Sequence, residues 1–150
     1  MQIIVFALVM GVVTFLGIAL VVNGAGIEGE PDILSWLGLG IAALMIAAHL
    51  IVPRISASAA LSQVSTEEVR NADDDRKFEL IAPAYQGQLI VACALLEGAA
   101  FLNLVGYMLN EYVGNLFAAM ALVAMIAAKI PTLSRVEFWV QDRAREIEMR

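Results

Sequence analysis

Residues 88–109 read QLIVACALLEGAAFLNLVGYML, an apolar run that is long enough to cross a bilayer. Glu97 stands in the middle of this run. A charged side chain at the centre of a membrane helix costs at least about 2.5–3.5 kcal/mol. We therefore expect this carboxyl to carry a proton, to have a hydrogen-bond partner or to serve a function. Asn103 follows two i+3 steps later, so the two side chains point about 120° apart and can address two neighbouring helices.

The composition of the whole chain also indicates a membrane protein. Of its 150 residues, 61% are hydrophobic and 16% are charged, whereas soluble domains average about 45–50% and about 25%. The apolar excess is concentrated in four windows, and only helices satisfy their own backbone in lipid at this length. We predict an all-α integral membrane protein, a four-helix bundle in one domain. Its predicted spans are residues 2–22, 33–52, 88–109 and 112–130.

The nine Lys and Arg residues set the expected orientation. They lie between the second and third windows or at and beyond the end of the fourth, while the other two connecting segments carry only acidic charge. The positive-inside rule places the loop 54–86 and the tail 131–150 in the cytoplasm, and the N-terminus by parity. The expected location is the inner membrane, crossed several times. Cleavage of the first window as a signal peptide stays open, because small residues follow it at 24–26.

Turn and capping residues predict where the helices begin and end. Asp32 is the expected N-cap of the second span, and Pro53 is expected to close it. The segment 134–137 reads Ser-Arg-Val-Glu, which is typical of a capping box. We expect it to open a short C-terminal amphipathic interfacial helix, although a helix that docks on a partner is the alternative. The apolar side of this helix would consist of Val136, Trp139, Val140 and Ala144.

The candidate intramembrane polar site consists of Glu97, Asn103, His49 and Thr14. In a functional interpretation, Glu97 binds a proton or cation reversibly at mid-membrane, and His49, roughly 7 Å closer to the cytoplasm, relays protons. In a structural interpretation, a protonated Glu97 donates to a backbone carbonyl, to Thr14 or to Asn103 and holds the helices together. His49 then merely reaches toward the interface.

Several classes of function lack their sequence signals. G-x-S-x-G, H-E-x-x-H, C-x-x-C and phosphate-loop motifs are absent. With one His and one Cys, both in apolar windows, a catalytic constellation is hard to assemble, and we expect neither an enzyme nor a metal or cofactor site. The formal net charge of −6 argues against a nucleic-acid partner.

The segment Ala94-Leu-Leu-Glu97-Gly-Ala-Ala-Phe101, followed by Tyr107, resembles the A-L-L-E-G segment of an uncharacterised group of small bacterial four-span membrane proteins. The resemblance covers the third and fourth windows and implies a bacterial membrane protein without implying an activity. The chain is also similar, by analogy, to the proteolipid c subunits of rotary ATPases, which are Gly/Ala-rich hairpins with one buried carboxylate. In those proteins the carboxylate lies on the second helix of the hairpin, whereas Glu97 lies on the first.

These observations favour a non-enzymatic scaffold or an accessory subunit of a membrane complex. The expected partners are the lipid bilayer and either further copies of the chain or other membrane subunits, because small residues recur at helical spacing in every window. The alternative is a proton- or cation-conducting oligomer that uses Glu97.

The orientation predicts which positions a membrane-impermeant thiol reagent can reach. In a Cys93→Ala background, Gly114→Cys should react with reagent added outside the cell. Ser62→Cys and Gln141→Cys should react only after permeabilisation. Labelling of Ser62→Cys from outside would contradict the four-span arrangement.

Overall fold

The computed structural model describes residues 2–24, 26 and 28–149, and this part of the chain is all-α, without a strand. The predicted all-α class is confirmed. The helices are α1 (Gln2–Val22), α2 (Ile33–Leu61), α3 (Thr66–Asn71), α4 (Asp74–Asn110), α5 (Val113–Ala127) and α6 (Leu133–Glu148).

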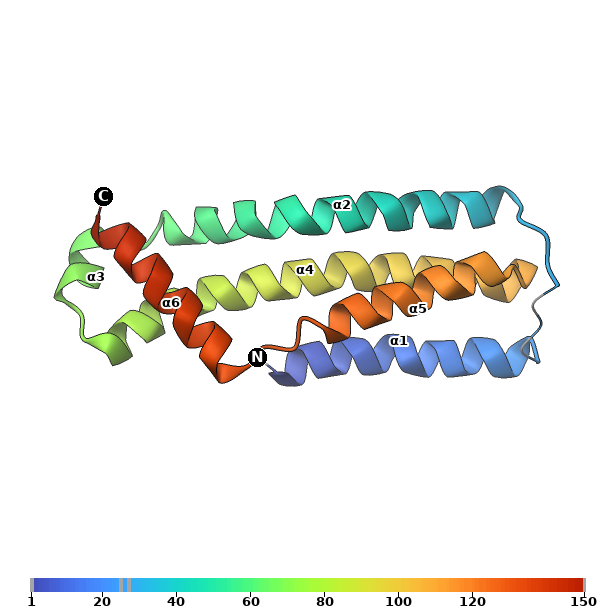
Figure 1. The fold of residues 1–150 in the computed structure, drawn as a ribbon, viewed down its shortest axis with the longest axis horizontal. Helices are drawn as coiled ribbons and strands as arrows, with labels where there is room; N and C mark the ends of the chain where they lie inside the picture. The colour runs from blue at the N-terminus through green and yellow to red at the C-terminus, as the bar shows by residue number, and fades with distance from the viewer. Residues whose placement is uncertain (1, 25, 27, 150) are drawn as a thin grey trace.

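Helix α4 is the centre of the molecule, because it packs against all five other helices. Although α1 and α2 are consecutive long helices, they share no contact among the described residues, and α4 lies between them (Figure 1). Helix α5 contacts α1, α2 and α4. The larger core lies where these four helices meet, around Val12, Leu96, Ala100, Leu104 and Leu122, which are all buried.

Three helices, α1, α2 and α4, are long and apolar enough to cross a membrane. Helix α5 is apolar but has only 15 residues, or roughly 22 Å, which is less than the ~30 Å of a hydrocarbon core. It is shorter than the predicted window 112–130 because the backbone tightens at its end. Lys129 and Ile130 donate to carbonyls three residues back, and Pro131 disfavours helical backbone in the residue before it.

The structure confirms one predicted helix boundary and contradicts two others. Asp32 is the N-cap of α2, and its carboxylate accepts a 2.8 Å hydrogen bond from the Ser35 amide, as expected. Pro53 does not close this helix, because α2 continues through it to Leu61. Proline removes only one backbone donor, and α2 continues on both sides of the buried Pro53. The capping box was also wrong, because α6 begins at Leu133 after Thr132 and no side chain caps it.

The predicted loop 54–86 is mostly helical and forms a second core with α6. Its buried members come from the end of α2, from α3, from the start of α4 and from α6: Leu61, Val69, Ile81, Ala82, Ala84, Val136, Val140, Ala144 and Ile147. The amphipathic C-terminal helix is therefore present, but the apolar side that we expected in the membrane interface packs on the protein itself. The sequence could not reveal this, because the partner surface is assembled from three other helices.

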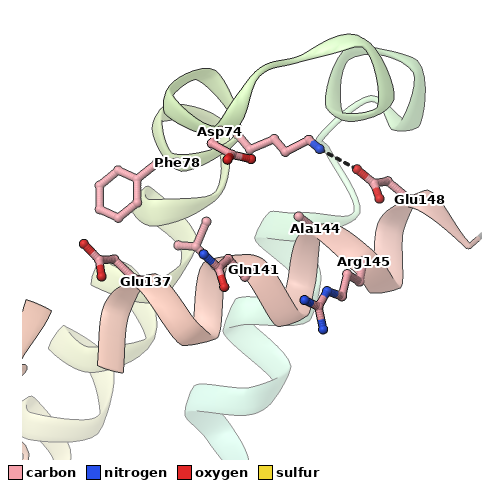
Figure 2. Close-up of a pocket in the computed structure, with 9 residues that line it drawn as sticks. Asp74, Phe78, Glu137, Gln141, Ala144, Arg145 and Glu148 are labelled. Atoms are coloured by element: carbon pink, nitrogen blue, oxygen red, sulfur yellow. Dashed lines mark ion pairs between the residues drawn. The ribbon is translucent and has the colours of Figure 1, made fainter. Parts of the chain in front are cut away.

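Two further contacts fix α6 against α4. The rings of Trp139 and Tyr85 lie 5.3 Å apart between centroids. The Lys77 ammonium lies 2.7 Å from a Glu148 carboxylate oxygen (Figure 2). This hydrogen bond to Glu148 raises the pKa of Lys77. The stabilisation that this ion pair gives to the folded state is therefore complete at neutral pH. It is lost as the pH rises through the raised pKa of Lys77.

A charge placed in the second core should release α6. In a Trp36→Phe background, which leaves Trp139 as the single tryptophan, Val140→Asp should shift the Trp139 emission to longer wavelength. Val140 is buried, and an uncompensated buried charge costs on the order of 3 kcal/mol. The matched control is Gln141→Asp, at an exposed neighbouring position. Equal emission spectra for the two variants would show that α6 is not docked.

Candidate functional site

A buried amide cluster joins α2, α4 and α5. Asn103 on α4 donates 2.9 Å hydrogen bonds from its side-chain amide to the carbonyls of Gly38 and Ala99. Asn115 on α5 donates to the Asn103 side-chain oxygen at 3.0 Å and to the Ser35 carbonyl at 3.3 Å. The side chains of Asn103, Asn115 and Ser35 are fully buried. This cluster holds three helices together by hydrogen bonds.

Two glycines make room for these amides. A Cβ on Gly38 would lie 2.9 Å from the Asn115 side-chain nitrogen, and one on Gly106 would lie 3.2 Å from the same atom. A methyl group at Gly38 would therefore push Asn115 away from its acceptors. Asn103 was predicted as a site residue, whereas Asn115 and Ser35 were missed. The sequence carried a signal that could have identified both residues, because a polar side chain stands near one end of each of three apolar windows.

Glu97 lies at the boundary between α4 and α1, half-buried and outside the amide cluster. A Cβ on Gly11 of α1 would lie 3.6 Å from one of its carboxylate oxygens, so the carboxyl lies against the α1 backbone. No hydrogen bond or ion pair joins it to any described residue. Thr14 is exposed and Asn103 bonds elsewhere. The expected role of Glu97 as a donor to either of them is therefore not seen.

The middle of α1 is held only by packing at this boundary. The rings of Phe15 and Phe101 meet edge to face, with centroids 5.3 Å apart. Hydrogen bonds tie α1 at its two ends: Gln2 donates to the Pro131 carbonyl at 2.9 Å, and Asn23 donates to the carbonyls of Tyr107 and Met108. The stretch of α1 beside Glu97 has no such bond to α4 among the described residues.

His49 lies on α2, away from both of these sites. Its ring is buried, and its Nδ1 atom has no hydrogen-bond partner in the described structure. No hydrogen bond connects His49 with Glu97 or Thr14 in the part of the chain that is described. The four predicted site residues therefore do not form one cluster.

One face of α4 is uncovered beside Glu97. Its exposed residues are Ile90, Ala94, Gly98 and Val105, and we call them the open face of α4. A Cβ on Gly98 would meet nothing within 4 Å. On a helical wheel these residues lie on the side of α4 opposite the buried Asn103 and Leu96, and Glu97 borders them. The open face combines small residues with an unpartnered carboxyl at its edge.

A cavity of about 340 Å³ lies between the start of α4 and α6 (Figure 2). Asp74, Glu137 and Glu148 line it together with Lys77 and Arg145. These charges oppose one another, and no group of three or more His, Cys, Asp or Glu residues in the described chain could hold a metal ion. The cavity accordingly offers no catalytic arrangement that we can identify.

Comparison with known proteins adds no relative: no family model, curated protein or solved structure matches the chain.

The amide cluster should carry measurable stability. Asn103→Ala removes an acceptor of the buried Asn115 amide and the side-chain donor to the Gly38 carbonyl, so it should lower the free energy of unfolding by about 1–3 kcal/mol. Asn115→Ala should cost a similar amount, and the double variant should cost less than the sum, because the two changes remove the same hydrogen bond. Unfolding in mixed detergent micelles provides the measurement, and Asn71→Ala, at an exposed position, is the control. Strict additivity of the two changes would contradict the cluster.

Proposed function

We propose that the protein is a four-helix integral protein of the inner membrane with both termini in the cytoplasm, and that it is a non-enzymatic scaffold or accessory subunit that self-associates through the open face of α4. The observation that carries this proposal is Glu97, a half-buried carboxyl on an apolar helix with no hydrogen-bond partner among the described residues. Lipid tails offer no such partner. The surface of a partner protein can supply a hydrogen-bond partner for Glu97.

The membrane placement follows from the helices themselves. Three are long and apolar enough to span, and α5 packs beside them through the larger core. Its short helix crosses the bilayer with the help of the turn residues 128–130, or of local thinning at a modest cost. Large apolar side chains such as Phe6, Leu44 and Phe117 are exposed on this part of the molecule, which suits contact with lipid.

A second copy of the chain fits the open face for two reasons. Ala94 and Gly98 allow a helix backbone to approach closely, which is how helices associate in lipid without a hydrophobic driving force. Across a two-fold axis, the second copy also brings a second Glu97 to the same interface. Protonated carboxyls both donate and accept, so the two can hydrogen bond to each other. Self-association thus gives Glu97 a hydrogen-bond partner, which it does not have within the described part of a single chain.

A larger side chain on the open face should block this association. A Cβ at Gly98 would meet nothing within 4 Å, and the same holds for Gly40 on the outer side of α2, so Gly98→Leu and Gly40→Leu form a matched pair. Energy transfer between labelled copies in liposomes should fall at least several-fold in Gly98→Leu and stay unchanged in Gly40→Leu. Energy transfer that is the same in both variants and in the unmodified protein would place the association elsewhere.

Proton or cation conduction is the second candidate, and the same unpartnered carboxyl favours it. A carboxyl without a competing donor can exchange protons or bind a cation at mid-membrane. Conduction should appear as a pH-dependent flux into liposomes that is lost in Glu97→Gln, a substitution that keeps size and hydrogen bonding. A protein that associates normally but shows no flux would leave the scaffold role alone.

A further inference from the structure

A second cavity, of about 210 Å³, lies where the end of α5 and the start of α6 meet α4. It is lined by Tyr85, Gln88, Leu89, Ala92, Lys129 and Arg135. Two cations from different elements therefore face one small space. No acidic side chain lines it among the described residues, although the chain as a whole has a net charge of −6.

Lys129 and Arg135 differ from other cations on this side of the molecule. Arg76, Lys77 and Arg143 each form an ion pair with a glutamate. Within the described chain, neither Lys129 nor Arg135 has a carboxylate at ion-pair distance. Two neighbouring cations without a counter-charge repel each other, so an anion between them relieves this repulsion. The guanidinium of Arg135 can bind a phosphate through two parallel hydrogen bonds.

Gln88 adds a polar requirement to the same cavity. Its side-chain oxygen is buried and has no hydrogen-bond donor within the described residues. Leaving a buried acceptor unpaired is unfavourable, so the preferred occupant carries a donor as well as a negative charge. A hydroxyl next to a phosphate meets both requirements.

The surroundings of the cavity are those of a membrane interface. Leu89 and Ala92 form the apolar side of the cavity. A neighbouring groove of about 340 Å³ is lined by Tyr85, Ser134, Arg135, Phe138 and Trp139. Phe138 is 73% exposed and Leu133 is 70% exposed. Tyr and Trp rings beside Lys and Arg are typical of the headgroup layer.

We propose that this cavity binds the headgroup of an anionic, hydroxylated phospholipid such as phosphatidylglycerol, with its phosphodiester between Lys129 and Arg135 and its hydroxyl donating to Gln88. The cavity takes the headgroup only, and the acyl chains remain in the surrounding bilayer. This proposal rests on the membrane placement given above, but it does not require self-association.

The test is a lipid titration of the full-length protein in detergent. In a Trp36→Phe background, Trp139 fluorescence reports binding next to the cavity. Short-chain phosphatidylglycerol should saturate the signal at concentrations where the matched phosphatidylcholine, glycerol phosphate and inorganic phosphate do not. Lys129→Gln and Arg135→Gln should each weaken the binding about fivefold, the effect of one basic residue near an anionic surface. Arg54→Gln, at an exposed cation that does not line the cavity, should not.

The remaining outcomes decide against the proposal. Equal binding of the two lipids would show that the headgroup charge is not recognised. Equal binding of inorganic phosphate would identify a site for free phosphate and not for lipid. Lys129→Arg keeps the charge and should retain binding, so its loss of binding would also contradict the electrostatic account. Gly98→Leu should bind lipid as the parent does, which separates this site from the proposed self-association.

Discussion

Helices in hydrocarbon gain little by hiding apolar surface from lipid, so close packing and hydrogen bonds must hold them together. In the membrane bundle that we propose, both requirements fall on α4. Its Asn103 amide bonds to α2 directly and to α5 through Asn115, and the glycines at 38 and 106 bring the backbones close enough for these bonds. Without the cluster, α2 would keep its packing and the hydrogen bond from Asn110 to its N-cap Asp32, and α5 would keep only its packing among the described residues.

The same arrangement leaves α4 incompletely covered. Helices α1, α2 and α5 occupy three of its sides, and the open face with Ala94 and Gly98 has nothing over it. Glu97 lies at the edge of this face, against the Gly11 backbone, and α1 is bonded to the rest of the described chain only near its ends. In the function that we propose, the approach of a second copy covers the small-residue surface and also gives the Glu97 carboxyl a hydrogen-bond partner.

The sequence predicts the parts of this structure that depend on local chemistry. Helix α1 has the bounds of its apolar window, 2–22, and Asp32 caps α2 as its side chain suggests. The sequence does not predict the parts that depend on distant residues. Pro53 was expected to end a helix, but α2 continues through it, and the residue is buried in the folded protein. The apolar side of α6 was assigned to the membrane, because Leu61, Val69 and Ile81 form a surface for it only after folding. Asn103 was found because it interrupts an apolar window, but its partner Asn115 is identified only once α5 is placed.

The most direct test of the central claim is disulfide cross-linking between two copies in native membranes. In a Cys93→Ala background, Gly98→Cys should form a covalent dimer under mild oxidation, because a two-fold contact at the open face brings the two copies of position 98 close together, and a disulfide requires Cα atoms about 4.4–6.8 Å apart. Gly40→Cys, which is equally open but on the outer side of α2, should remain monomeric. A dimer from Gly40→Cys with none from Gly98→Cys would contradict the account.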